Sequence, residues 1–395
     1  MSSRIRVGIV VGGNPRWLGG VNYHRNLLTA VHRFPHPSIE PVVITGRTTD
    51  SLLAGFPPLE IARSGMIDSR SALGFVRKGL SSVSSRDWLL QKLLEKHRIS
   101  LLSHSQALVA GPTVGWIADF QHVHLPEFFS QEERLYRDRT FLALCGKCEQ
   151  MIVSSECAKA DLSSFAPQYA HKARVLRFVA TPQVVPNLPT LPELQQRYSF
   201  DEPFFLLPNQ FWAHKNHRVV ISALKLVKER GKRALVLATG LADDSRNPGF
   251  FDSLMQYARE CDVLDEFRTL GVIPFQDLAG LMQFAVAFIN PSYFEGWSTT
   301  VEEAKSMGKG VLLSDIPVHR EQSPELGVYF HPDDPEALAA ALLDASSGHD
   351  ARSDADLQAR ARQGLPARQE RFAATYQSIV LEAAQTSRQS SVSAG

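Results

Sequence analysis

Residues 285–304 read AVAFINPSYFEGWSTTVEEA and pass from an apolar run through a polar loop into a helical pattern. The run AVAFIN is short and apolar, as in a buried strand, and the pattern after it predicts a helix from about 299 to 307. A strand followed by a helix is the repeating unit of parallel α/β sheets, which bind ligands at the carboxyl ends of their strands. The loop between them is therefore predicted to lie at a ligand-binding edge.

Strands alternate with helices on both sides of a proline-rich stretch. Upstream, the apolar run 5–11 is followed by glycines and a helical pattern, and downstream a strand at 204–207 precedes a helix over 218–230. Residues 180–193, ATPQVVPNLPTLPE, contain four prolines, which interrupt every periodic pattern and remove backbone donors. We therefore predict an α/β fold of two Rossmann-like domains with parallel sheets, joined by a linker.

The end of the chain departs from this alternation. Residues 366–383 have a helical pattern with Phe372, Tyr376 and Ile379 on its apolar positions, so this helix is expected to pack on another part of the protein. The residues after it have almost no apolar content. The predicted parts are an N-terminal domain at 1–180, a linker at 181–192, a C-terminal domain at 193–365, a helix returning to the N-terminal domain at 366–385 and a disordered tail at 386–395.

Composition narrows the class of protein. The 395 residues include 42 Lys and Arg against 41 Asp and Glu, whereas a duplex-binding protein normally carries a basic excess, so nucleic acid is not an expected partner. No apolar run reaches the ~18 residues that cross a bilayer, and the apolar start is shorter than a secretory signal, so a cytoplasmic location is expected. The 4 cysteines are too few for a disulfide framework, and Cys145 and Cys148 share a helical face and are interpreted as core residues.

The first polar cluster surrounds the predicted helix start at residue 299. The first amides of a helix lack intrahelical acceptors and its dipole favours negative charge, so the amides of Ser298, Thr299 and Thr300 are predicted to face an anion. Glu303, one turn into the helix, is a candidate to bind a pair of sugar hydroxyls, and Glu295 precedes it in the loop. Two glutamates at this spacing also occur on solvated helix faces, so the pair alone leaves both interpretations open.

The second cluster is PNQFWAHKNH at 208–217, between the strand at 204–207 and the next helix. Lys215 stands at the start of that helix, where the helix dipole disfavours positive charge. A bound anion would resolve the conflict. An exposed lysine with its ammonium group in water is the alternative.

The third cluster is WIADFQHVHLPE at 116–127, in which residues able to transfer protons alternate with aromatic ones. Asp119, His122 and His124 are its candidates. The two histidines could bind a metal, but no third ligand stands at a familiar spacing. A buried core histidine is the alternative for either of them.

These clusters, together with Gly19 and Gly20, resemble the retaining glycosyltransferases of the GT-B fold, specifically glycosyltransferase family 4. The most specific element is the E-x7-E signature of that family, matched here by Glu295 and Glu303. The resemblance runs over nearly the whole chain. It implies two Rossmann-like domains whose parallel sheets face a central cleft, with the nucleotide-sugar donor in the C-terminal domain and the acceptor in the N-terminal domain.

The resemblance also implies roles for single residues. Glu303 is expected to bind the donor ribose, and Lys215 the donor phosphate. Asn209 stands where many family members carry an arginine, and Arg177 is a candidate replacement. The donor-binding residues implied in this way are Gly19, Gly20, Asn209, Lys215, Thr239, Gly240, Val272, Ile273, Ser298, Thr299, Thr300 and Glu303.

The catalytic residues implied by the resemblance are His122, Asp119 and Glu295, of which Glu295 contacts the transferred sugar. Many members carry a His-Asp pair in the N-terminal domain, and this chain has Ala118 before Asp119. The usual histidine is therefore absent. His122 or His124 would supply an equivalent group, with His122 favoured, while Asp119 is the alternative residue for positioning the acceptor.

The activity implied by the resemblance is the transfer of a hexose, taken as mannose-type, from a GDP- or UDP-sugar to a glycan or lipid-linked acceptor in surface polysaccharide assembly. No cofactor and no metal are expected, because the D-x-D motif at 354–356 lies in a polar stretch after the last strand. Lys215 and the helix start would instead supply positive charge to the leaving group. Two alternatives remain: a GT-B nucleotide-sugar epimerase or hydrolase, and a catalytically silent sugar-nucleotide-binding protein.

Residues 75–98, FVRKGLSSVSSRDWLLQKLLEKHR, combine basic residues with Trp88 and several leucines. Peripheral contact with the inner face of a membrane is one interpretation of this pattern. A helix that packs its leucines inward and keeps its basic residues in water is the other.

Overall fold

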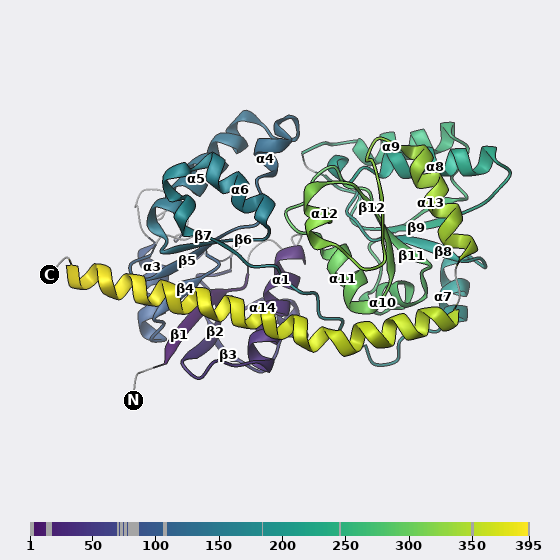
Figure 1. Cartoon of the computed structure of the whole chain (residues 1–395). Coiled ribbons are helices and arrows are strands. Elements are labelled where there is room, and N and C mark those ends of the chain that lie inside the picture. The colour runs from purple at the N-terminus through teal and green to yellow at the C-terminus, as the bar shows by residue number, and fades with distance from the viewer. Residues whose placement is uncertain are drawn as a thin grey trace. The chain divides into compact units, whose positions relative to one another are not determined.

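The computed structural model divides into two compact units. The first unit contains Met1–Val123, Ser130–Ala180 and Pro366–Gly395, and the second contains His124–Phe129 and Thr181–Leu365 (Figure 1). The residues that the structure describes are 4–12, 18–68, 71, 74, 77, 87–105, 109–183, 185–244, 246–348 and 351–393.

The first unit is built on a parallel sheet of seven strands in the order β3-β2-β1-β4-β5-β6-β7. Its central strands are short and almost entirely buried, as parallel strands with helices on both faces must be. The strands are β1 (Ile5–Val10), β2 (Ile39–Thr45), β3 (Glu60–Arg63), β4 (Leu101–Ser103), β5 (Thr113–Ile117), β6 (Gln150–Val153) and β7 (Ala173–Val175). The helices of its described part are α1 (Leu18–Arg33), α3 (Trp88–Lys96), α4 (Gln121–His124), α5 (Gln131–Lys147) and α6 (Glu156–Phe165).

The second unit is built on a parallel sheet of six strands in the order β10-β9-β8-β11-β12-β13. Its strands are β8 (Phe204–Leu207), β9 (Leu235–Thr239), β10 (Phe267–Gly271), β11 (Ala287–Asn290), β12 (Gly310–Ser314) and β13 (Gly327–Phe330). Its helices are α7 (Leu191–Tyr198), α8 (His217–Glu229), α9 (Phe250–Glu260), α10 (Phe275–Phe284), α11 (Thr299–Met307), α12 (Pro317–Gln322) and α13 (Pro335–Ser347). The predicted strand at 204–207 and helix at 299–307 are confirmed.

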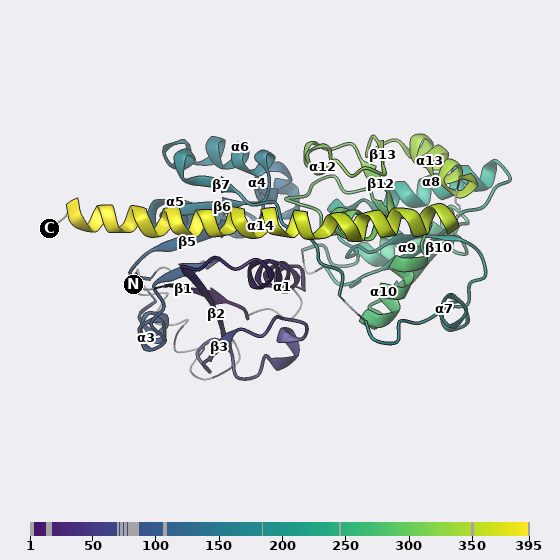
Figure 2. The same cartoon turned by 60° about the horizontal axis from the view of Figure 1, so that its bottom comes forward.

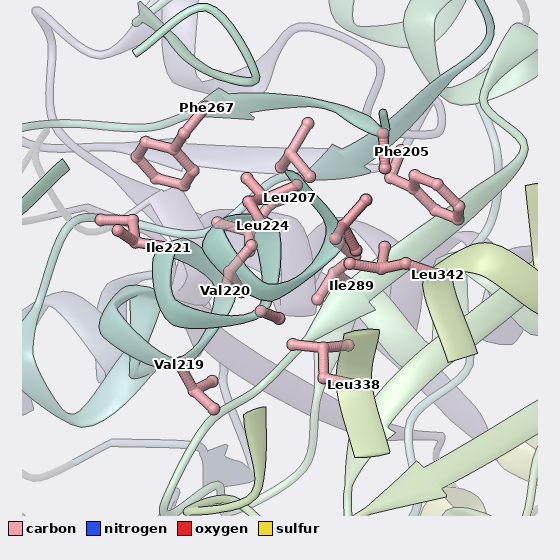
Figure 3. Packing of buried hydrophobic residues seen from close by; sticks show 14 of the residues in the cluster. Phe205, Leu207, Val219, Val220, Ile221, Leu224, Phe267, Ile289, Leu338 and Leu342 are labelled. Carbon is pink, nitrogen blue, oxygen red and sulfur yellow. The ribbon is translucent and has the colours of Figure 1, made fainter. Parts of the chain in front are cut away.

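One face of the second sheet packs on α8 and α13 through large aliphatic and aromatic side chains. Figure 3 shows Phe205 and Leu207 of β8 with Leu224 of α8 and Leu342 of α13 in this cluster. These side chains are at most 1% exposed. The core holds the strand ends rigidly, so the loops that leave those ends are fixed at their base.

The last helix, α14 (Ala351–Ser393), is continuous, and its residues belong to both units (Figure 2). Pro366 lies inside it, at the residue where the chain passes into the first unit. Within the first unit Tyr376 is 1% exposed, and Gln377 donates from Nε2 to the carbonyl oxygen of Phe34 at 2.8 Å. This half of the helix therefore packs on the first unit.

Two expectations for the end of the chain are corrected. The helix begins at Ala351 rather than at 366, and the predicted disordered tail is helical through Ser393. The reason is cooperative: once a helix has formed, each added residue contributes one backbone hydrogen bond, and neither Gly nor a second Pro interrupts α14 between Pro366 and its end.

Cys145 and Cys148 lie in the core of the first unit beside Phe141, as predicted. Burial raises the pKa of Cys145 to about 11 and that of Cys148 to about 12. Both therefore remain neutral thiols at neutral pH and behave as small apolar side chains.

The basic segment 75–98 is described only in part, and Lys78 and Arg86 lie outside the described residues. Helix α3 buries Leu90, Leu93 and Leu94. Trp88 at its start is 58% exposed. Across the described part of the chain, no helix is both long and apolar enough to span a membrane.

Candidate functional site

The donor-side candidates gather at the carboxyl edge of the second sheet. Strands β8 and β11 are neighbours in this sheet, although β9 and β10 lie between them in sequence. Such a position is a topological switch point, where the loops leaving the two strands diverge and leave room for a ligand. The loop after β8 carries Lys215 and the loop after β11 carries Glu295, which explains why residues 80 apart in sequence meet here.

Lys215 and Glu295 form an ion pair with 2.6 Å between Nζ and Oε1. Their side chains are 14% and 11% exposed, so Lys215 is not a solvated surface lysine. Burial by itself would raise the pKa of Glu295, but the charge and hydrogen bond of Lys215 outweigh it, and the pKa lies below its ordinary value. The pair therefore presents one partly buried ammonium and one partly buried carboxylate at the sheet edge.

Helix α11 begins beside this pair, and Ser298 is its N-cap. The hydroxyl of Ser298 accepts a hydrogen bond from the amide of Val301 at 3.3 Å. Its own amide donates to Oε1 of Gln322 at 3.0 Å, so this amide is not directed at an anion as predicted. Of the three amides predicted to face an anion, those of Thr299 and Thr300 therefore remain as hydrogen-bond donors at the described helix start.

Behind the helix start lies a buried polar network that the sequence did not reveal. Asn290, the last residue of β11, donates from Nδ2 to the hydroxyl of Ser298 at 2.5 Å. The hydroxyl of Ser292 lies 2.7 Å from Oε1 of Glu295 and 2.8 Å from Oδ1 of Asn290. The one signal for this network was a polar residue, Asn290, at the end of an otherwise apolar strand.

Asn209 belongs to the same network. Its Oδ1 accepts from the hydroxyl of Thr300 at 3.2 Å, and its Nδ2 donates to Oδ1 of Asn290 at 3.4 Å. The residue is 6% exposed. Its amide is therefore engaged inside the protein and ties the loop after β8 to α11.

The loop after β9 approaches the loop after β8 closely. Gly240 has φ of +153°, and a Cβ at this position would lie 2.4 Å from the carbonyl oxygen of Asn209. Thr239 before it is 5% exposed. A glycine is required here because a side chain would push the two loops apart.

Of the remaining donor-side candidates, Val272 is 70% exposed, whereas Ile273 packs on the core of the unit. Glu303 is half-buried on α11. Its neighbour Glu302 is 1% exposed and accepts from Nζ of Lys305 at 2.9 Å. The two adjacent glutamates thus face different surroundings, and Glu303 is the one that solvent can reach.

A further cation near this loop was missed in the sequence. Arg246 pairs with Asp244, with 3.0 Å from Nε to Oδ1, and its guanidinium lies 4.8 Å from the ring centroid of Trp212. Burial, with the charges of Lys215 and Arg246, lowers the pKa of His214 well below its ordinary value. Arg246 therefore brings a guanidinium close to Trp212, and Asp244 balances its charge.

The other predicted site residues lie in the first unit. Arg177 lies there, 3.6 Å from the carboxylate of Glu156. Gly19 and Gly20 are in the first turn of α1, which begins at Leu18 rather than after the glycines. Gly13, one of the glycines that follow the apolar run 5–11, lies outside the described residues.

Among the catalytic candidates, Asp119 accepts from the amide of Gln121, the first residue of α4, at 3.0 Å. His122 is 3% exposed, with its Nε2 3.1 Å from Oδ1 of Asp138. Its ring packs against Phe141 at a centroid distance of 5.3 Å, and burial lowers its pKa. The structure thus places His122 in the core of the first unit.

His124 is exposed and clusters with the second unit. Its ring centroid lies 5.1 Å from that of Phe294, the residue before Glu295. Of the two histidines that the sequence left open, His124 is therefore the one with an accessible ring.

The first aspartate of the D-x-D motif at 354–356 forms an ion pair with a buried lysine. Asp354 accepts from Nζ of Lys309 at 2.7 Å, and Lys309 is 2% exposed. Within the described residues, no group of three or more His, Cys, Asp or Glu side chains is arranged to hold a metal ion.

A family of known proteins matches the part of the chain that holds this site. Residues 193–363 match the family Glycosyl transferases group 1. The chain is 28% identical over 141 residues to the O-antigen chain mannosyltransferase RfbU of Salmonella typhimurium, and 22% identical over 223 residues to the O-antigen chain mannosyltransferase B of Escherichia coli. These matches span 36% and 55% of this chain and only 38% and 57% of the relatives.

Among solved structures, the chain is similar to Anabaena Alr3699/HepE in complex with UDP and glucose. The TM-score is 0.67 at 15% identity, over 95% of this chain and all of that one. At this identity the likeness is one of fold. It confirms the predicted α/β class and the GT-B fold.

Proposed function

We propose that the protein is a retaining glycosyltransferase of family 4 that transfers a mannose-type hexose from a nucleotide-diphosphate sugar to a glycan or lipid-linked acceptor in surface polysaccharide assembly. The observation that carries the proposal is the partly buried Lys215–Glu295 pair beside the start of α11, inside the region that matches the glycosyl transferases. The printed names of the relatives support mannose and an O-antigen-like acceptor. The UDP bound to HepE supports a nucleoside diphosphate, with GDP the alternative base.

The proposed donor site uses three kinds of group. Lys215 and the amides of Thr299 and Thr300 bind the diphosphate, because each offers positive charge or N–H donors at one sheet edge. Glu303 binds the ribose hydroxyls and Glu295 a hydroxyl of the sugar. The base lies against the main chain near Val272 and Ile273, and the tight approach of Thr239 and Gly240 to the loop after β8 shapes the floor of the site.

Sugar transfer requires the nucleoside diphosphate to depart while an oxocarbenium-like sugar develops. Stabilising the negative charge on the leaving group is therefore the main catalytic demand. Lys215 and the dipole of α11 meet this demand without a metal in our proposal, and Asp354 serves Lys309 instead. Retention follows from departure and attack on the same face of the sugar.

The acceptor binds the first unit in this proposal, and Asp119 is the residue assigned to position it. His122 is buried beside Asp138, so its effect on transfer is indirect and acts through the fold around it. Its exposure makes His124 the better candidate to contact a reacting group. The exposed Trp88 beside the basic residues of α3 is proposed to contact the lipid surface that carries such an acceptor.

An acceptor-dependent transfer assay tests this function. The protein is incubated with UDP- and GDP-sugars and a panel of lipid-linked and free glycans, and nucleotide release and product anomer are followed by NMR. Release of nucleotide that needs the acceptor, with an axial donor linkage kept in the product, is expected. Free sugar without acceptor would indicate a hydrolase, donor isomerisation an epimerase, and binding without turnover a silent protein. Glu303→Ala is the control that should abolish transfer.

A further inference from the structure

Gln322, the last residue of α12, holds the start of α11 in place with its side chain. The residue is 2% exposed. Its Oε1 accepts from the amide of Ser298 at 3.0 Å, and its Nε2 donates to the carbonyl oxygen of the same residue at 3.0 Å. One side-chain amide therefore engages both backbone groups of the N-cap.

The orientation of that amide is determined by its neighbours. Nε2 also donates to Oε1 of Glu302 at 3.2 Å, and a carboxylate and a carbonyl oxygen can only accept. Oε1 faces an N–H donor. The opposite flip would place acceptor against acceptor and donor against donor, so a single arrangement satisfies all three contacts.

The contacts at Ser298 also orient the peptide group that follows it. A peptide group is planar and trans, so its C=O and N–H point in opposite directions. Holding the carbonyl oxygen of Ser298 toward Gln322 directs the amide N–H of Thr299 to the other side. The hydrogen bond from the amide of Ser298 to Oε1 of Gln322 fixes the preceding peptide group in the same way. That peptide group connects α11 to the loop that carries Glu295.

The surroundings make this arrangement stiff. Lys305 donates from Nζ to the backbone oxygen of Gln322 at 2.8 Å and to Glu302 at 2.9 Å. The hydroxyl of Ser298 accepts a hydrogen bond from Nδ2 of Asn290, the last residue of β11. The N-cap is thus held from α12, from β11 and from within α11.

We propose that Gln322 is a positioning residue for the donor diphosphate: it aims the amide of Thr299 and fixes the loop of Glu295 relative to α11. It touches no reacting atom and acts through the two peptide groups that it holds. This role rests on the proposed function, because it presumes that the amides at the start of α11 bind a phosphate.

The test measures the affinity of UDP and GDP by calorimetry in the full chain. Gln322→Leu places an apolar side chain of similar volume at this position and removes all three contacts. Its Kd is expected to rise about tenfold, which corresponds to about 1.4 kcal/mol of binding free energy. Gln358→Leu is the matched control, because Gln358 is 8% exposed, bonds to Gln283 and lies on α14 in the same unit. It should leave the Kd within about twofold of wild type.

A second variant separates positioning from general stability. In Gln322→Glu an ionised carboxylate faces the carbonyl of Ser298 and the carboxylate of Glu302, whereas the protonated acid can donate to one of them and still accept from the amide of Ser298. The ratio of its Kd to that of wild type is expected to fall as the pH is lowered from about 8 to about 5.5. This readout remains available if Gln322→Leu fails to fold.

The outcomes are distinct. Wild-type affinity in Gln322→Leu, or a Kd ratio of Gln322→Glu that does not change with pH, overturns the positioning role and leaves the proposed function standing. Equal losses in Gln322→Leu and Gln358→Leu also overturn it, since they would reflect stability alone. Failure of the wild-type chain to bind either nucleotide overturns the proposed function, and the role of Gln322 with it.

Discussion

Replacing Lys215 separates its part in folding from its part in binding. In Lys215→Met the carboxylate of Glu295 loses its counter-ion, and water cannot replace that ion fully because the side chain is only 11% exposed. The hydroxyl of Ser292, 2.7 Å away, is then the remaining polar contact that the structure shows for Oε1 of Glu295. The variant is therefore expected both to be less stable and to bind a phosphate more weakly.

The two effects have different sizes. Breaking a buried ion pair by removing one partner costs about 3 to 5 kcal/mol, whereas removing both charges together is close to neutral. A hydrogen bond to a charged group contributes about 1.5 to 3 kcal/mol, so loss of the phosphate contact should raise the Kd roughly 10- to 150-fold. Lys215→Met combined with Glu295→Gln should therefore recover most of the stability and none of the affinity.

The assay pairs urea unfolding with calorimetric titration of UDP and GDP for the wild type, both single variants and the double variant. The non-additive part of the unfolding free energies measures the coupling of the pair. A double variant with wild-type stability and weakened nucleotide binding is expected. A double variant that binds nucleotide as tightly as the wild type would refute the assignment of Lys215 to the diphosphate.

Three further outcomes are expected. Gly240→Ala should lower the unfolding free energy by about 1 to 3 kcal/mol, because its Cβ would lie 2.4 Å from the carbonyl oxygen of Asn209; an unchanged melting temperature would contradict this close approach. His122→Leu should destabilise the first unit while leaving nucleotide affinity unchanged, and an intact fold with abolished transfer would instead give His122 a direct role. His24 should contribute a loss of about 1.4 kcal/mol of unfolding free energy per pH unit as the pH drops below the ordinary histidine pKa, because burial lowers its pKa from 6.5 to about 4 and only the unfolded chain takes up this proton in that range; the pH slope from urea unfolding should be shallower by about this amount in His24→Gln, and an equal slope would contradict the contribution of His24.

Hydrophobic pattern was sufficient to predict the elements near the site. The run AVAFIN and the amphipathic segment after it became β11 and α11, because a buried strand and a helix packed on it need these patterns whatever the rest of the chain does. The family resemblance implied that Lys215 and Glu295 belong to one donor site, but it did not imply their ion pair. Their contact depends on β8 and β11 being neighbours, which no local pattern encodes.

The parts that the sequence did not reveal depend on distant contacts. Gln322 lies 24 residues from Ser298, and nothing in HREQSPE distinguishes it from a surface glutamine until α12 is placed beside α11. The continuous helix through Pro366 was missed for a related reason: proline weakens a helix locally, and packing at both ends compensates for that loss. His122 was chosen for its chemistry, whereas its neighbours Phe120 and Phe141 place it in the core.

The second unit is proposed to bind a nucleotide-diphosphate sugar. A thermal-shift panel of UDP, GDP, ADP and their sugars tests it most directly, because a ligand at 100 times its Kd adds about 2.7 kcal/mol of stability. One nucleotide series is expected to raise the melting temperature of the wild type and to raise that of the Lys215→Met and Glu295→Gln double variant less, because a 10- to 150-fold higher Kd leaves about 0.3 to 1.4 kcal/mol of stabilisation at the same concentration. A panel in which no nucleotide or nucleotide sugar stabilises the wild type would contradict the claim.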